Sequence, residues 1–268
     1  MCIAVFLWRC HPLYQFFLLH NRDEYHDRPA EALAWWDSEG VQILGGRDVL
    51  AGGTWLACSR NGRLAFITNF REVEKIPQAK TRGDLPVRFL QSKQSPLEFA
   101  REVVKETHRY NGFNLIVADF ISESMVYVTN RPKGSSGFMS KVSPGLHVLS
   151  NASLDSPWPK AQRLRDGFKE LLDRHGHSEL PAKEMACGLM MSTIKDEDQS
   201  LLPGIYPPEF EFPASSVFVD FDSPLGRYGT RSTSAVYVKL NREVSFFVRN
   251  LEKEAWKEEV VTFSIEAD

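Results

Sequence analysis

The chain has 268 residues, of which 43% are hydrophobic and 25% charged, and its formal net charge is −3 at pH 7. This balance is typical of a globular protein and excludes a disordered chain, while the lack of a basic excess argues against nucleic acid as a partner. The length allows a full hydrophobic core. With no break in composition and no internal repeat, we expect a single domain over residues 1–268.

The four cysteines, at positions 2, 10, 58 and 187, form no CxxC pair. This spacing indicates reduced thiols in a reducing compartment, and neither a metal site nor a bound cofactor is expected. No apolar run is long enough to predict a transmembrane segment. Arg9, His11 and Pro12 interrupt the apolar start of the chain, which favours two short strands over a cleavable targeting segment.

In chain order, apolar and β-branched runs predict strands at residues 2–7, 16–21, 54–59 and 64–69. Asn61-Gly62 predicts a hairpin between the last two of these strands. The capping-box pattern Ser95-Pro96-Leu97-Glu98 then predicts a helix that ends near residue 107. Further strands are predicted at residues 114–119, 125–129 and 147–150.

The second half of the chain begins with two predicted helices, at residues 159–174 and 182–194. In the first, Leu164, Phe168 and Leu171 have helical spacing, and Gly176 is a plausible stop. Four prolines predict a surface loop over residues 202–213. Strands are predicted at residues 216–221, 234–240, 244–248 and 260–265. Strands, then helices, then strands again indicate the α+β class with antiparallel sheets.

Cys2 is the first residue with chemical interest. Removal of Met1 by a methionine aminopeptidase would leave a thiol and an α-amine on the same residue. An α-amine with a pKa near ~8 can accept the thiol proton, as in covalent catalysis with an N-terminal amine as base. The plain alternative is that Cys2 only begins a buried strand.

Four polar residues, Asn21, Arg22, Asp23 and Glu24, are predicted at the end of the second strand, where an exposed turn is their ordinary meaning. On a strand, Asn21 and Asp23 would share one face, and Arg22 and Glu24 the other. A carboxylate beside the amine would orient it, and an arginine near the thiol would favour thiolate. Both can reach one site only if a bulge or turn intervenes.

Other candidate residues lie near strand ends. Asn69 and Asn151 could donate to an oxyanion, although asparagine is also common there in turns. Arg231 could bind a carboxylate or phosphate through its fork of donors, or form a surface salt bridge. Trp55 and Trp158 could line an apolar acyl pocket, or belong to the core.

Seven motifs stand in the order expected of one protein family. They are Met1-Cys2, Asn21-Arg22-Asp23-Glu24, Gly52-Gly53-Thr54-Trp55-Leu56, Thr68-Asn69, Tyr110-Asn111-Gly112-Phe113-Asn114-Leu115, Leu149-Ser150-Asn151-Ala152 with Pro157-Trp158, and Tyr228-Gly229-Thr230-Arg231. On these motifs the sequence resembles, nearly end to end, the transport and Golgi organisation protein 2 family, also called the NRDE family. After Arg231 the resemblance continues only in the strand pattern.

That family is similar to the cysteine N-terminal-nucleophile hydrolases, such as the choloylglycine and penicillin V acylases. The likeness implies a four-layer αββα sandwich of two antiparallel sheets. It also implies roles for six residues: Cys2 as nucleophile, Asp23 as the carboxylate that orients the amine, Arg22 as the nearby arginine, Asn69 and Asn151 as oxyanion donors, and Arg231 as the distal arginine. The acylases separate their arginine from their aspartate, whereas Arg22 and Asp23 are adjacent here. Asn21 is therefore an alternative for the place of Arg22, in contact with the substrate.

Two functions follow from these expectations. The first is hydrolysis of an amide or an acyl thioester by Cys2. The second, implied by the resemblance, is non-catalytic binding and trafficking of haem or of an acyl lipid or acyl-coenzyme A, linked to Golgi organisation and lipid homeostasis. Both functions predict a small-molecule ligand that is acyl or haem-like. The protein is expected in the cytoplasm, with a mitochondrial or Golgi-associated location as alternatives. The oligomeric state is left open.

Overall fold

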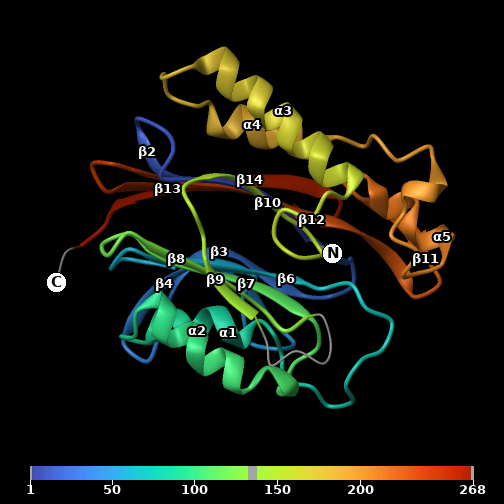
Figure 1. Ribbon diagram of the computed structural model, residues 1–268, viewed down its shortest axis with the longest axis horizontal. Helices are drawn as coiled ribbons and strands as arrows, with labels where there is room; N and C mark the ends of the chain where they lie inside the picture. The colour runs from blue at the N-terminus through green and yellow to red at the C-terminus, as the bar shows by residue number, and fades with distance from the viewer. Residues whose placement is uncertain (1, 132–137, 267–268) are drawn as a thin grey trace. The chain divides into compact units, whose positions relative to one another are not determined.

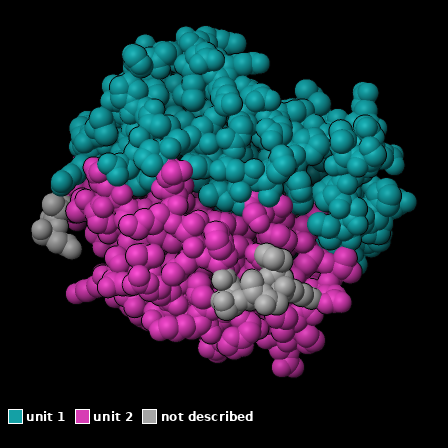
Figure 2. Space-filling model, in the orientation of Figure 1, with its two compact units in different colours: residues 1–28, 144–150, 154–263 teal, residues 29–143, 151–153, 264–268 magenta. Residues whose placement is uncertain are grey.

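The chain forms two compact units, which Figure 2 shows in different colours. The computed structural model describes residues 2–131 and 138–266. Unit 1 comprises residues 1–28, 144–150 and 154–263, and unit 2 comprises residues 29–143, 151–153 and 264–268. Within the described residues, no helix is both long enough and apolar enough to cross a bilayer. That residues 1–268 make one domain stays a prediction.

Unit 1 is an antiparallel sheet covered on one face by α3 and α4, which contact its strands β1, β10, β2 and β12 (Figure 1). The described residues give it seven strands in the order β10-β1-β2-β12-β13-β14, with β11 beside β12. The strands are β1 (Cys2–Trp8), β2 (Tyr14–Tyr25), β10 (Gly145–Leu149), β11 (Asp220–Ser223), β12 (Gly226–Lys239), β13 (Glu243–Glu252) and β14 (Ala255–Ser264). The helices are α3 (Pro159–His175), α4 (Ala182–Gly188) and α5 (Pro208–Glu211), with 3-10 turns at Leu189–Met191, Gln199–Leu201 and Pro213–Ser215.

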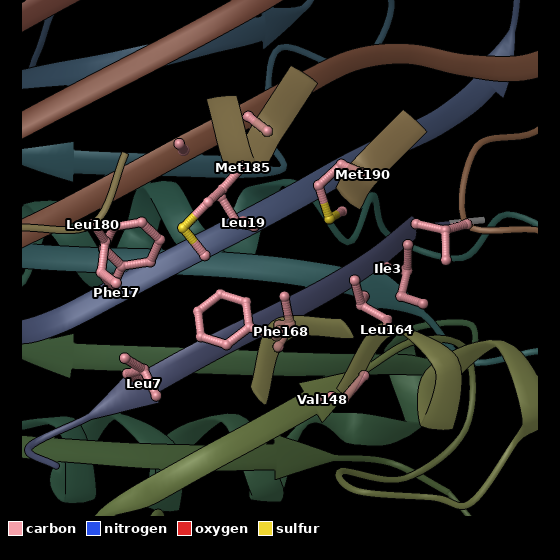
Figure 3. Packing of buried hydrophobic residues seen from close by; sticks show 14 of the residues in the cluster. Ile3, Leu7, Phe17, Leu19, Val148, Leu164, Phe168, Leu180, Met185 and Met190 are labelled. Atoms are coloured by element: carbon pink, nitrogen blue, oxygen red, sulfur yellow. The ribbon is translucent and has the colours of Figure 1, made fainter. Parts of the chain in front are cut away.

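The core of unit 1 lies between the sheet and its helices. Alternate side chains of β1 and β2 face α3 and α4, and Figure 3 shows how they pack. The cluster includes Ile3, Leu7, Phe17, Leu19, Leu164, Phe168, Met185 and Met190. Full burial of an aliphatic or aromatic side chain contributes about 1.5–3 kcal/mol. All residues of β1 are buried, which is why its sequence is apolar throughout and does not alternate.

Unit 2 is a second antiparallel sheet, of seven strands among the described residues, in the order β3-β4-β5-β6-β7-β8-β9. Helices α1 and α2 contact its central strands and enclose a second core (Figure 1). The strands are β3 (Ala30–Ser38), β4 (Val41–Asp48), β5 (Leu56–Ser59), β6 (Arg63–Asn69), β7 (Phe113–Asp119), β8 (Ser124–Thr129) and β9 (Phe138–Lys141). The helices are α1 (Asp84–Gln91) and α2 (Pro96–Lys105), followed by a 3-10 turn at Thr107–Arg109.

Several local predictions are confirmed by these elements. The α+β class with two antiparallel sheets is correct. Ser95 and Glu98 form the predicted capping box at the start of α2. Gly62 adopts φ +79°, as the Asn-Gly hairpin between β5 and β6 requires. Helix α3 ends one residue beyond its predicted limit, and Gly176 follows it with φ +57°.

Four predictions are wrong. The surface loop predicted at residues 202–213 contains helix α5, whose Glu211 is buried. The second strand does not end at residue 21, because β2 continues to Tyr25 and buries Asn21, Arg22 and Asp23. The helix predicted at residues 182–194 ends at Gly188 and continues as a 3-10 turn, since glycine weakens a helix. The strand predicted at residues 216–221 begins only at Asp220. Before it, Phe218 donates its backbone N–H to Ser192 O at 2.8 Å, outside any sheet.

The core of unit 1 predicts a large effect of Phe168→Ala. Phe168 is fully buried on α3 against the sheet, so its truncation should lower the free energy of unfolding by about 3–5 kcal/mol. Urea denaturation followed by circular dichroism measures this change. Lys169→Ala, at the next position and exposed, is the matched control and should change the free energy little. Equal effects of the two substitutions would contradict this packing.

Candidate functional site

Cys2 lies at the start of β1, at one end of a row of side chains that crosses the middle of the unit 1 sheet. In the strand register, Cys2 is opposite Arg22 of β2, and Arg22 is opposite Ser232 of β12. Side chains directly opposite one another on antiparallel strands share a face. Cys2, Arg22 and Ser232 are all buried, with exposed fractions of 7%, 5% and 2%. Arg22, rather than Asn21, therefore shares the face of Cys2.

The other face of the same strands carries Asn21. Asn21 is opposite Ile3, a member of the core that faces the helices. Its Nδ2 donates to Met190 O at 2.8 Å and to Val217 O at 3.0 Å. Its Oδ1 accepts from Thr233 Oγ1 at 2.7 Å. The first two hydrogen bonds connect β2 to segments outside the sheet, and the third joins β2 to β12. The contacts of Asn21 are therefore structural, and its place beside the substrate stays a prediction.

A β-bulge in β12 positions the residues around Arg231. The register passes from Thr230 opposite Asp23 to Ser232 opposite Arg22, so Arg231 is the extra residue. The bulge lies in β12 and not in β2, so Arg22 and Asp23 keep opposite faces of their strand. The Arg231 guanidinium donates from Nη1 to Tyr25 O at 3.2 Å and also to Arg28 O. These bonds hold the segment after β2, and binding of a substrate anion by Arg231 stays a prediction.

Asp23 is a buried carboxyl that follows Arg22 on β2, beside the row formed by Cys2, Arg22 and Ser232. Its Oδ1 accepts from Thr230 Oγ1 at 2.7 Å, and its backbone oxygen accepts from the Tyr228 hydroxyl at 3.2 Å. Burial raises the pKa of Asp23 to about 6, although the positive charge of Lys160 and the Thr230 hydrogen bond act in the opposite direction. A carboxyl with this pKa can change its protonation state near neutral pH.

Burial is the largest influence on the Cys2 thiol. It raises the pKa of the thiol above the ordinary value, and the Asp23 carboxylate adds to the rise. A hydrogen bond from the backbone N–H of Asp23 and the charge of Arg22 act in the opposite direction. The net result is a thiol that holds its proton at neutral pH, so it needs a base to become a nucleophile.

Sequence reasoning missed Lys160 and His20. Lys160 is buried on α3 and donates to Ala214 O at 3.1 Å. It lies four residues before Leu164, in the apolar stripe of the helix. A lysine in such a stripe is unusual, and this is the signal that could have identified it from the sequence. His20 is fully buried on the face of Cys2, and burial together with the charge of Arg22 lowers its pKa to about 3. Its imidazole is therefore neutral at physiological pH.

Asn69 and Asn151 belong to unit 2, where the fold brings them together. Asn69 ends β6, and Asn151 follows β10 and is fully buried. Asn151 Nδ2 donates to Asn69 O at 2.8 Å, and Asn151 O accepts from the backbone N–H of Arg71 at 2.7 Å. In unit 1, Ser150 Oγ donates to Cys2 O at 3.2 Å, which connects the end of β10 to the start of β1.

The two predicted aromatic contacts have packing explanations. Trp158 is half-buried at the start of α3 and packs against the core of unit 1. Trp55 lies in unit 2 before β5, and a Cβ added to Gly46 would come within 2.6 Å of its ring, so glycine at this position makes room for the tryptophan. Their place in an acyl pocket stays a prediction. In the part of the chain that the structure describes, no group of three or more His, Cys, Asp or Glu side chains could hold a metal ion.

Comparison with solved structures supports the architecture. The chain matches a crystal structure of the C2A mutant of conjugated bile acid hydrolase from Clostridium perfringens with a TM-score of 0.53. The match covers 99% of this chain and 97% of the hydrolase, at 10% sequence identity. At this identity the likeness shows the fold alone, and it confirms the predicted N-terminal-nucleophile hydrolase-like fold.

Comparison with protein families identifies the relatives of the chain. The model of the family described as Transport and Golgi organisation 2 matches residues 1–253. The Transport and Golgi organization protein 2 homolog of Bos taurus is 34% identical over 263 residues, which cover 94% of this chain and 93% of the relative. The Homo sapiens homolog is 31% identical over 264 residues, with the same coverage. With the predicted motifs in place and both relatives aligned almost end to end, the chain belongs to the Transport and Golgi organisation 2 family.

Proposed function

We propose that the chain is a hydrolase of amide or thioester bonds, with Cys2 as its nucleophile after Met1 has been removed. One observation carries the proposal: the buried Cys2 thiol is directly opposite Arg22, and its pKa responds to the Asp23 carboxylate. A buried thiol, a cation and a carboxyl on neighbouring strands make up the charged groups of a covalent catalyst.

The base in this proposal is the α-amine of Cys2 itself. Burial keeps the thiol protonated, and His20, an imidazole on the same face, has a pKa too low to act as a base at neutral pH. An α-amine has a pKa near ~8, so its neutral form is available. The backbone N–H of Asp23 donates to the Cys2 thiol. This closeness supports the proposal that the Asp23 carboxylate orients the amine.

The reaction then has two halves. The amine accepts the thiol proton while Sγ attacks the carbonyl carbon, so an S–C bond forms and the carbonyl oxygen becomes an oxyanion. When the oxyanion collapses, the C–N or C–S bond of the substrate breaks, and the leaving group takes the proton from the amine. In the second half, water gives a proton to the amine and attacks the acyl-enzyme. The S–C bond breaks, the thiol regains its proton and a carboxylic acid leaves. We assign the oxyanion donors to the Asn69 and Asn151 carboxamides, as the family resemblance implies.

The nucleophile is tested by Cys2→Ala. A panel of acyl thioesters and N-acyl amides is incubated with the protein, and product release and the mass of the quenched protein are measured. The wild type should lack Met1 and carry an acyl group on Cys2, and the variant should lose about 10³-fold or more in turnover. Cys10→Ala, which removes an exposed thiol, is the matched control. Equal turnover by Cys2→Ala, or a mature chain that retains Met1, would contradict the amine mechanism.

The alternative function, non-catalytic binding of haem or an acyl lipid, stays a prediction. The same variant separates it from catalysis, because a binding protein would keep its ligand affinity after Cys2→Ala and would show no Cys2-dependent product with any member of the panel.

The state of Asp23 predicts a pH dependence of stability. With a folded-state pKa of about 6 against an ordinary value of 3.8, the carboxyl contributes stability that is fully present below pH ~4 and is lost as pH rises through ~6. Asp23→Asn has no such proton to lose. Its free energy of unfolding relative to wild type should therefore rise between pH 4 and pH 7, by up to about 3 kcal/mol.

Urea denaturation across this range measures the rise. Asp166→Asn, an exposed carboxyl on α3, is the matched control. A difference between Asp23→Asn and wild type that stays constant or falls with pH would show that burial does not raise the pKa of Asp23.

A further inference from the structure

Ser232 is a buried hydroxyl to which the mechanism assigns no role. Its exposed fraction is 2%, and Ser232 Oγ makes no hydrogen bond within the described chain. A buried polar group without a partner is destabilising, and native proteins contain few of them. When an unpaired hydroxyl lies beside reactive groups, a bound ligand can supply the missing hydrogen-bond partner, and this would explain why the hydroxyl is present.

The bulge at Arg231 is what places Ser232 on the face of Cys2. In a regular ladder Arg231 would be opposite Arg22, and Ser232 would be opposite Asn21 and would face the helices. Because the bulge leaves Arg231 unpaired, Ser232 is opposite Arg22, and Thr233 takes the position opposite Asn21. Bulges often redirect a side chain near an active site. The hydrogen bond from Thr233 to Asn21 at 2.7 Å holds this register.

The row offers one kind of chemistry to a substrate. Neighbouring strands are about 4.8 Å apart, so Ser232 lies roughly 10 Å from Cys2 with Arg22 between them. Beyond Ser232, the row continues with Asn250 of β13. Of these four side chains only Arg22 is charged, and the nearby His20 is neutral. A guanidinium followed by a hydroxyl donor suits an oxygen-rich anion.

We propose that Ser232 is a substrate-binding residue whose hydroxyl, together with the Arg22 guanidinium, holds a carboxylate or phosphate of the substrate. The anion would lie a few bonds from the scissile carbonyl, within the roughly 10 Å between Cys2 and Ser232. This inference rests on the proposed function for the identity of the scissile bond, and it narrows the substrates to anionic amides or thioesters.

The test uses three acyl thioesters with one acyl chain and different leaving groups: 3-mercaptopropionate, 2-mercaptoethyl phosphate and the neutral 3-mercaptopropionamide. Wild type should turn over at least one of the two anionic esters with a kcat/KM about 10- to 100-fold above the neutral one, since a hydrogen bond to a charged group is worth that factor. Whichever anion is preferred identifies the source as carboxylate or phosphate. Ser232→Ala should reduce this preference about tenfold, mainly through KM, and leave the neutral ester unaffected.

Two controls separate binding from a structural role. Ser232→Thr keeps the hydroxyl and should restore the preference. Ser234→Ala removes an equally buried hydroxyl one row away, opposite His20, and should leave the preference unchanged. The urea midpoint of Ser232→Ala without substrate should equal or exceed that of wild type, because the lost hydroxyl has no partner in the described chain. The proposal would be overturned by a wild type with no anion preference, or by a Ser232→Ala variant that keeps the preference. The hydrogen-bond partner of the Ser232 hydroxyl would then be an ordered water.

Failure of catalysis can be distinguished from failure of this inference. Calorimetric titration of the three esters into the Cys2→Ala protein, with and without Ser232→Ala, measures binding without turnover. Tighter binding of an anionic ester that depends on Ser232 supports the inference even if wild type hydrolyses none of the esters, in which case only the proposed hydrolysis fails. Equal binding of all three esters overturns the inference whatever the turnover.

Discussion

The pairing register of β1, β2 and β12 is the constraint on which the candidate site depends. It places Cys2, Arg22 and Ser232 in one row, and Asn21 and Asp23 on the other face of the same strands. A shift of one residue would exchange the two faces. The register is held by the buried pairs Thr230 with Asp23 and Thr233 with Asn21, on either side of the bulge. Polar side chains that have partners therefore determine where the chemically active ones point.

The fold could be predicted from the sequence where local signals are strong. The capping box of α2, the Asn-Gly turn and the apolar stripe of α3 each correspond to an element of the structure. No comparable signal marks β3, most of which is exposed or half-buried, or the short strand β9. Residues 21–24 are polar, so the sequence left an exposed turn and a strand end as alternatives. Their partners on β1 and β12, the latter more than 200 positions away, explain why a central strand accepts them.

The candidate residues were easier to name than to orient. Motif order was sufficient to select Cys2, Asp23 and Arg22, but the alternation rule left Arg22 and Asn21 as alternatives because the partner strands were unknown. The bulge that places Ser232 is a property of two strands together, so neither strand alone could reveal it. Lys160 and His20 carry no motif, and their importance comes from burial beside Asp23 and Arg22, respectively.

The order of the strands also has a consequence for synthesis of the protein. In unit 1, β2 pairs with β12, and the hydrogen bond between Thr230 and Asp23 joins residues 207 positions apart. Most of unit 2 is made from the intervening residues 29–143. At a translation rate of about 5–20 residues per second, β1 and β2 would wait roughly 10–40 s on the ribosome for their partner strand. During that interval two apolar strands would have an unpaired edge, so the nascent chain is a natural client for a chaperone.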